Sequence, residues 1–419
     1  MQPKYQCLEI NSFLLDKILS LAAPDGDTRF CFVPSTPFCA MVVICRALGH
    51  EYSVPNFEAC ALDVVRVLQT SNSYSDVPPI VSNLGWCLFF ALACFILQTA
   101  TGNYSYVDRL WSITPIVYAW NYLYVAWARG LDPDVRLVVV VMLVTQWGCR
   151  LTYNFYRKGG YRLSEEDYRW DFTRAIIPHP VAWHTFSFAF IAFYQHFLLF
   201  LITCPLQTVF KVWENKFKSD IFDNWCVRRL LLPLDHAQTH PLRRTYLDTA
   251  ASLLFGGLLI LETIADQQQW NYQQIKWTML NKGHQLSELR PPYNLGFITT
   301  GTFAYSRHPN FFAEQGIWWS VYLFAVAAND GRHNWTFLGA LLLTLLFQGS
   351  TRLTEYLTLQ KYPRYAEYQQ AVSMLVPLWP SSSLTQPQET NPEPKTAELK
   401  TKPNESKADT KSKEPKKEK

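Results

Sequence analysis

The chain has 419 residues, of which 49% are hydrophobic and only 17% are charged, whereas roughly 25% are charged in a typical soluble domain. The formal net charge of +4 is small for this length, so the composition points away from nucleic acid as a partner. The mean hydropathy is close to zero because long apolar runs alternate with polar loops, and each run therefore has to be considered separately.

The apolar runs are long enough to cross a membrane as helices. The hydrocarbon core of a bilayer is about 30 Å thick and needs about 20 mostly apolar residues in a helix. Buried helices of a large soluble protein are the alternative, but uncharged runs of this length recur too often for that. The sequence therefore predicts an all-α, polytopic transmembrane bundle of about seven spans, at 81–100, 112–128, 135–151, 182–205, 247–265, 315–328 and 335–349.

The two ends of the chain differ from this pattern. The stretch 29–48 is apolar enough to contact the membrane, but two prolines and Arg46 argue against a span. The residues after 380 are rich in Lys, Glu, Pro, Ser and Thr and contain no aromatic side chain, so they cannot form a core. We therefore expect three regions: a partly membrane-associated N-terminal extension (1–80), a transmembrane domain (81–380) and a disordered tail (381–419).

The tail also suggests a location and an orientation. Its last four residues, Lys416-Lys417-Glu418-Lys419, resemble the di-lysine retrieval signal of endoplasmic-reticulum membrane proteins, which faces the cytosol. We therefore expect a multi-pass protein of that membrane with a cytosolic C-terminus. Counting spans back from the tail places three polar segments on the cytosolic side: 153–175, 266–295 and 305–310.

One loop does not fit this orientation. The segment 207–246 falls on the opposite side, although it is rich in Lys and Arg, and basic loops tend to stay in the cytosol. Two explanations stay open: part of this segment lies on the membrane surface, or one span is misassigned.

The cysteines give no sign of a metal site or a disulfide framework. There are ten of them, no two have CxxC spacing, and several lie inside apolar runs. This distribution is typical of small buried side chains.

The first polar cluster follows the third predicted span. On a helix, Arg150, Tyr153, Asn154 and Arg157 would share one face. A solvated loop at the membrane edge is the ordinary explanation for such a segment. Arg150 argues against it because this residue lies inside the span, where an arginine usually faces a polar cavity.

The second polar cluster lies at the end of the fifth predicted span. Glu262 and Asp266 are four residues apart and therefore share a helix face. Two carboxylates this close would repel each other unless they were bound to donors. A helix end in the headgroup region is the alternative.

The third cluster is the most specific. Pro309 suits the first position of a helix, and Arg307 and His308 stand just before it. A helix N-terminus beside an arginine is a good anion site, and arginine binds phosphate through two parallel hydrogen bonds. Further cations and aromatic rings follow the next helical hairpin and could serve the phosphates and the adenine of a nucleotide. The sequence therefore predicts a nucleotide site in the C-terminal half, without the GxGxxG fingerprint of soluble dinucleotide folds.

The segment 307–314, RHPNFFAE, resembles the RHPNYxGE signature of membrane steroid-reductase-like proteins, a group that includes steroid 5α-reductases and the sterol C14 and C7 reductases. EDYRW at 166–170 and YPRYAEY at 362–368 resemble elements of an uncharacterised branch of that group. The likeness covers roughly 108–380. It implies a helical membrane bundle that holds NADPH in a cytosol-facing C-terminal half and takes its substrate from the lipid.

The resemblance also implies roles for individual residues. Phe311 and Ala313 depart from the signature, and the change from Tyr to Phe removes one hydroxyl from the site. Carried over position by position, the residues implied to contact NADPH are Arg307, His308, Asn310 and Glu314, followed by Arg352, Glu355, Tyr365 and Tyr368.

The predicted reaction is hydride transfer from the nicotinamide to an activated C=C bond of a sterol, steroid or other lipid-like substrate. A donor is needed where negative charge develops on the substrate oxygen, and Tyr153, Glu166 and Tyr168 are candidates by type and sidedness. One alternative is an S-adenosylmethionine-dependent methyltransferase related to the isoprenylcysteine carboxyl methyltransferases, which also carry an R-H-P element. The other is an inactive lipid-binding scaffold. The stretch 310–314 favours the reductase.

Overall fold

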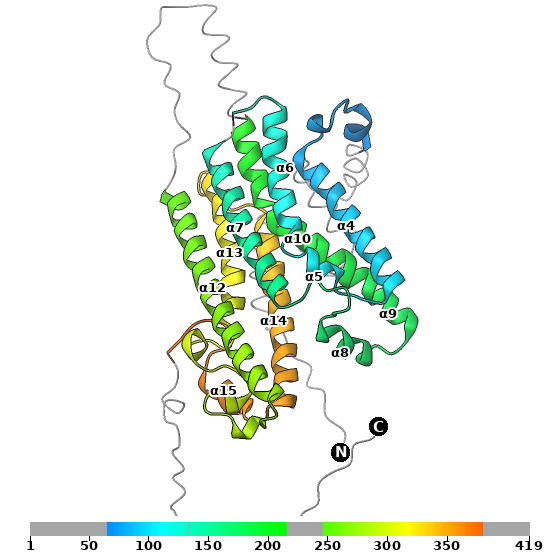
Figure 1. The fold of residues 1–419 in the computed structure, drawn as a ribbon. Coiled ribbons are helices and arrows are strands. Elements are labelled where there is room, and N and C mark those ends of the chain that lie inside the picture. Colours follow the sequence, from blue (N-terminus) through cyan, green and yellow to red (C-terminus); the bar gives the residue numbers. More distant parts are fainter. Residues whose placement is uncertain (1–64, 133, 216–245, 380–419) are drawn as a thin grey trace, which may run out of the picture.

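The computed structural model describes residues 65–132, 134–215 and 246–379, and no strand occurs among these residues. The predictions for residues 1–64, for most of the basic segment 207–246 and for the tail lie outside the described residues. The all-α prediction is confirmed for the described part. Its helices, shown in Figure 1, are α4 (Pro79–Thr101), α5 (Tyr106–Leu110), α6 (Thr114–Ala128), α7 (Val135–Arg157), α8 (Tyr168–Ile176), α9 (Pro180–Phe186), the π-helical η2 (Ser187–Tyr194), α10 (Gln195–Thr203), α12 (Tyr246–Asn281), α13 (Pro309–Ala328), α14 (Phe337–Lys361) and α15 (Tyr365–Ala371).

Each of the seven predicted spans coincides with a helix. Five helices of the described chain are long and apolar enough to cross a membrane: 79–101, 135–157, 180–215, 246–281 and 337–361. The remaining two are α6, which has 15 residues, and α13, which has 20. The chain is thus a multi-pass helical protein. Its fourth span is longer than predicted, because the helix that begins at Pro180 continues to Asn215 through α9, η2 and α10.

Local sequence explains where several helices begin. Pro79, Pro180 and Pro309 each stand in the first turn of a helix, where the missing N–H costs nothing. Asp134 precedes α7, and its carboxylate accepts a hydrogen bond of 3.2 Å from the backbone N–H of Arg136. Asp167 caps α8 in the same way.

The core runs through the middle of the bundle around α13. This helix packs along α12 and also contacts α7 and α14, and most of its side chains are buried. Trp147 of α7 meets Trp318 of α13 edge to face, with ring centroids 4.8 Å apart. Gly339 brings α14 close to α10, because a Cβ at this position would run into the carbonyl of Leu201.

The ends of several elements gather at one end of the bundle. In Figure 1, α8, α15 and the C-terminal ends of α12 and α14 lie at the same end, whereas α6 ends at the opposite one. The helix α8 and the end of α12 belong to two of the three polar segments predicted to share one side of the membrane, which stays a prediction. The arrangement also brings residues from both halves of the sequence to one place.

Candidate functional site

Arg307 is held entirely by groups of the protein. Its Nε and Nη2 donate to the two carboxylate oxygens of Glu355 on α14, over 2.6 and 3.0 Å. Its Nη1 donates to the carbonyl of Gln369 over 2.8 Å and also to that of Val372. The guanidinium therefore joins the segment before α13 to α14 and to the end of α15. These bonds use four of its five N–H groups, so one N–H on Nη2 is left for a further acceptor such as a phosphate oxygen.

Glu355 collects further donors around the same carboxylate. His308 Nε2 lies 3.0 Å from Oε1, and Gln369 Nε2 donates to Oε2 over 3.0 Å. The hydroxyl of Tyr365 donates to Oε1 over 3.3 Å, and burial raises the pKa of Tyr365 well above its ordinary value, so the phenol keeps its proton. With only 5% of its surface exposed, Glu355 is a buried carboxylate whose charge is balanced by Arg307.

Backbone hydrogen bonds extend this cluster into a paired segment. The N–H of Arg307 donates to Ser373 O over 2.8 Å, and that of His308 donates to Met374 O over 3.1 Å. In the other direction, the N–H of Leu378 donates to Tyr305 O over 2.9 Å. Residues 373–378 thus lie along residues 305–308 and hold them against the end of the bundle. We call this arrangement the C-terminal clasp.

A second polar cluster lies inside the bundle between α7, α12 and α13. Arg150 places Nη2 2.5 Å from Glu262 Oε1 and Nη1 2.6 Å from Asp266 Oδ2. Asn154 donates to Asp266 Oδ2 over 2.8 Å, and Asn310 donates to Oδ1 over 3.3 Å. The prediction that Glu262 and Asp266 share a face and need donors is confirmed. We call this group the inner cluster.

Glu314 joins the inner cluster from α13. Its two carboxylate oxygens accept the indole N–H groups of Trp147 and Trp318 over 2.7 and 3.0 Å. The three acids Glu262, Asp266 and Glu314 are each about 95% buried. Three buried carboxylates around one guanidinium are costly in an apolar bundle, so this cluster is an expected place for a polar ligand.

Three atoms of the inner cluster are buried without a hydrogen-bond partner within the described chain: Glu262 Oε2, Arg150 Nε and Arg150 Nη2. Arg150 Nη2 still lies in the ion pair with Glu262 Oε1, which leaves Glu262 Oε2 and Arg150 Nε as the two atoms to consider. One is an acceptor and the other is a donor. A ligand group that both donates and accepts, such as a carboxamide, would satisfy the two atoms together.

The predicted site residues are only partly brought together. Arg307, His308, Glu355 and Tyr365 meet in the clasp, and Tyr368 joins them by donating its hydroxyl to Phe303 O. Asn310 and Glu314 point instead into the inner cluster. Arg352 is exposed on α14, outside both groups.

The three predicted donors lie away from both groups. Tyr153 is 63% exposed on α7, so it does not share the inward face of Arg150 and Asn154. Glu166 accepts the backbone N–H of Tyr104 over 2.6 Å and pairs with Arg174 at 3.2 Å. Tyr168 is 56% exposed at the start of α8.

The EDYRW segment fastens α8 to the bundle. Trp170 donates its indole N–H to Asp108 of α5 over 3.0 Å, and burial raises the pKa of this carboxyl. Arg169 bonds Asp167 over 2.8 Å. The conspicuous charges of this segment therefore serve local structure.

Sequence reasoning missed the two tryptophans that bind Glu314. Trp147 and Trp318 lie in apolar runs, where an aromatic ring is ordinarily read as core or lipid contact. The usable signal was Glu314 itself, because a carboxylate at the start of a span needs donors from neighbouring helices.

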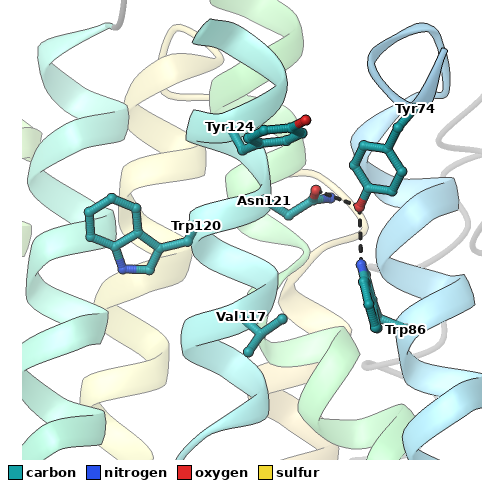
Figure 2. A pocket seen from close by; sticks show the side chains of 6 residues that line it. All are labelled: Tyr74, Trp86, Val117, Trp120, Asn121 and Tyr124. Carbon is teal, nitrogen blue, oxygen red and sulfur yellow. Dashed lines mark hydrogen bonds between the residues drawn. The ribbon is translucent and has the colours of Figure 1, made fainter. Parts of the chain in front are cut away.

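A separate hollow lies on the outer surface of the bundle, between α4 and α6. It has a volume of about 440 Å³ and is walled by Tyr74, Trp86, Val117, Trp120, Asn121 and Tyr124 (Figure 2). Tyr74 donates its hydroxyl to Asn121 over 2.8 Å and accepts the indole N–H of Trp86 over 3.0 Å. Tyr74, Asn121 and Trp86 are thus bonded to one another, and the hollow presents mainly ring faces. The C-terminal end of α6, which contributes to this hollow, lies opposite α15 (Figure 1).

Comparisons with known proteins place the chain in a family. Residues 94–372 match the model of a family described as a protein of unknown function, DUF1295. The chain is also similar to the uncharacterised protein C594.04c of Schizosaccharomyces pombe, with 34% identity over 321 residues, which cover 74% of this chain and 83% of that protein. No solved structure matches the chain. The matched region contains the inner cluster and residues 305–308 of the clasp but ends before residues 373–378, and the chain belongs to the DUF1295 family.

Proposed function

We propose that this protein is a membrane-embedded, NADPH-dependent reductase that transfers a hydride to an activated C=C bond of a sterol, steroid or other lipid-like molecule. The observation that carries the proposal is the inner cluster, a group of buried charges inside an apolar bundle with one donor and one acceptor unused. The steroid-reductase-like signature at 307–314 supplies two of its members, Asn310 and Glu314.

The residues of the inner cluster fit the nicotinamide end of such a cofactor. Its carboxamide has one N–H₂ and one carbonyl, which complement Glu262 Oε2 and Arg150 Nε. When bound, the nicotinamide supplies a transferable hydride at C4. Asp266 accepts hydrogen bonds from Arg150, Asn154 and Asn310. These bonds keep Arg150 Nε, the donor, and Glu262 Oε2, the acceptor, in a fixed geometry.

The surrounding bundle supports the rest of the reaction. The side chains around Glu314 are apolar rings, which keep water away from the reacting atoms. A substrate oxygen that gains negative charge needs a proton or a hydrogen-bond donor. Tyr153, Glu166 and Tyr168 stay predictions for that donor, and Tyr153 is 63% exposed on α7, one residue before Asn154 of the inner cluster.

We further propose that α6 and α13 complete seven spans and that the clasp faces the cytosol of an endoplasmic-reticulum membrane. This orientation gives a soluble cofactor direct access to the end of the bundle where α12, α14 and α15 meet (Figure 1). It follows from the di-lysine-like end of the chain.

Ligand binding by the detergent-purified protein tests the proposal. We would titrate NADPH and S-adenosylmethionine side by side against the wild type, Asp266→Asn and the control Asp171→Asn, whose carboxylate is 73% exposed on α8. Micromolar NADPH binding that is lost in Asp266→Asn and kept in Asp171→Asn is the expected result. Binding of S-adenosylmethionine alone would indicate a methyltransferase, and binding of neither would indicate a scaffold without the chemistry.

A further inference from the structure

The helix α12 is longer than one membrane span. A helix of 36 residues is about 54 Å long, whereas the hydrocarbon core is only about 30 Å thick. Lys276 lies in its C-terminal end, roughly 15 Å along the helix from Asp266 of the inner cluster. In Figure 1 the same end of α12 lies beside α15 and the C-terminal end of α14.

Lys276 is a buried cation surrounded by aromatic rings. Only 3% of its surface is exposed, and its ammonium donates to Gly296 O over 2.9 Å. The ammonium nitrogen lies 5.3 Å from the ring centroid of Trp277, 5.6 Å from that of Tyr362 and 5.8 Å from that of Tyr272.

The backbone at Gly296 is shaped for this approach. Its φ of +85° is unfavourable for other residues, and a Cβ there would run into the ring of Tyr362. Glycine therefore allows both the carbonyl and the ring to reach Lys276.

Lys361, at the end of α14, faces the same two rings. Its ammonium nitrogen lies 5.7 Å from the centroid of Trp277 and 5.5 Å from that of Tyr362. The ion pairs found within the described ranges include neither Lys276 nor Lys361. Two like charges at one pair of rings repel each other, and an anion between them would remove that cost.

We infer that Lys276 and Lys361, together with Trp277 and Tyr362, bind a phosphomonoester attached to an aromatic base, and that this ligand is the 2′-phosphoadenosine end of NADPH. This inference rests on the proposed function and names the residues that distinguish NADPH from NADH. A phosphomonoester carries close to two negative charges, which match the two ammonium groups. Trp277 is 47% exposed, so its indole offers accessible ring surface to the adenine. Lys276 lies roughly 15 Å along the helix from Asp266, so one extended dinucleotide can reach both the lysine site and the inner cluster.

The test compares two pairs of ligands, and the two members of each pair differ only in the 2′-phosphate. NADPH and NADH differ only in the 2′-phosphate, and adenosine 2′,5′-bisphosphate and 5′-AMP repeat that difference without the nicotinamide. The variants are Lys361→Gln and Lys276→Gln, and the control is Lys282→Gln, which removes an exposed lysine just past the end of α12. Lys361 is exposed, so its replacement leaves folding intact even if that of buried Lys276 does not.

We expect the wild type to bind NADPH at least tenfold more tightly than NADH, and Lys361→Gln to lower NADPH affinity about tenfold while NADH affinity changes less than twofold. Lys282→Gln should behave like the wild type. Equal binding of NADPH and NADH by the wild type, or equal losses for both in Lys361→Gln, would overturn the inference and leave the reductase proposal standing.

The opposite outcome, in which the phosphomonoester site is present but the reductase proposal fails, is also measurable. Lysine-dependent binding of the bisphosphate, without binding of either dinucleotide, would support the phosphomonoester site and reject the reductase. A lipid headgroup is the other source of this chemistry. The lipid alternative is tested with nanodiscs of phosphatidic acid and of phosphatidylcholine. If the protein binds phosphatidic acid more tightly, and Lys361→Gln removes this preference without changing the nucleotide affinities, the site binds lipid and the nucleotide assignment is wrong.

Discussion

Arg307 and Glu355 form a two-point ion pair between the segment before α13 and the C-terminal part of α14, with N–O distances of 2.6 and 3.0 Å. Both side chains are at least nine-tenths buried. The pair therefore has a structural role in closing the clasp, in addition to any role in ligand binding. It sets the position from which α13 carries Asn310 and Glu314 into the inner cluster.

Breaking this pair should be strongly destabilising. Arg307→Ala leaves the Glu355 carboxylate buried without its cation, which typically costs about 3–5 kcal/mol. The double variant Arg307→Met/Glu355→Met removes both charges and should be less destabilised than Arg307→Ala. Thermal unfolding in detergent measures both effects. The exposed pair Arg364–Glu367, at 3.7 Å, is the control, and Arg364→Ala should cost no more than about 1 kcal/mol. If Arg307→Ala and Arg364→Ala lowered the stability of the protein by similar amounts, burial would not strengthen the Arg307–Glu355 pair.

The indole of Trp147 should matter through its N–H. Trp147→Phe keeps an aromatic ring but leaves one oxygen of the buried Glu314 without a donor, at a cost of about 1–3 kcal/mol. Trp319→Phe is the matched control, since its indole donates to the neutral hydroxyl of Thr344 over 3.1 Å, and about 1 kcal/mol is expected there. Chemical or thermal denaturation would rank the two variants. Equal destabilisation of Trp147→Phe and Trp319→Phe would mean that Glu314 finds another donor.

Two glycines of α14 should respond to alanine in opposite directions. At Gly339 the added methyl meets the backbone of Leu201, so α10 and α14 must move apart, at a cost of about 1–3 kcal/mol. At Gly349 nothing lies within 4 Å of the added methyl, and the higher helix propensity of alanine should stabilise the protein by about 0.5–1 kcal/mol. The direction of the shift in unfolding temperature shows whether each variant is stabilised or destabilised. Stabilisation by Gly339→Ala would contradict the close packing of the two helices.

Tyr365 should make the protein sensitive to alkaline pH. Burial, with the nearby charge of Glu355, raises the pKa of Tyr365 in the folded protein, while the unfolded chain keeps a value of about 10. Below that value the phenol is neutral in both states and contributes no pH dependence. Above it the unfolded chain releases a proton that the folded protein retains, so stability falls. Tyr365→Phe should therefore lose less stability than the wild type between pH 9 and about pH 11, which unfolding midpoints at several pH values would reveal.

Much of the fold was predictable because its signals are local. Each predicted span coincides with a helix, and Pro309 begins α13 as expected for a proline after a polar segment. The spacing of Glu262 and Asp266 was sufficient to predict a shared face, because helical periodicity alone determines it. Arg150 was predicted to face a polar interior, and it pairs with both of these acids there.

The site was less predictable because its contacts are not local. Arg307 bonds the carbonyls of Gln369 and Val372, and a carbonyl is present at every residue, so the sequence does not mark which ones are used. Tyr153 satisfied the helical spacing but lies on the outside, since the burial of its neighbours depends on where α12 packs. The meeting of Lys276 with Lys361 likewise depends on how two helix ends are placed.

The clasp has a consequence for the order in which the protein is made. The Val372 carbonyl that accepts from Arg307 lies 65 residues further along the chain, and ribosomes add about 5–20 residues per second. Arg307 is therefore synthesised several seconds before its last acceptors exist. The backbone bonds of Arg307 and His308 to residues 373 and 374 can form only after those residues are made, and a chain that stops before residue 373 would lack this part of the clasp.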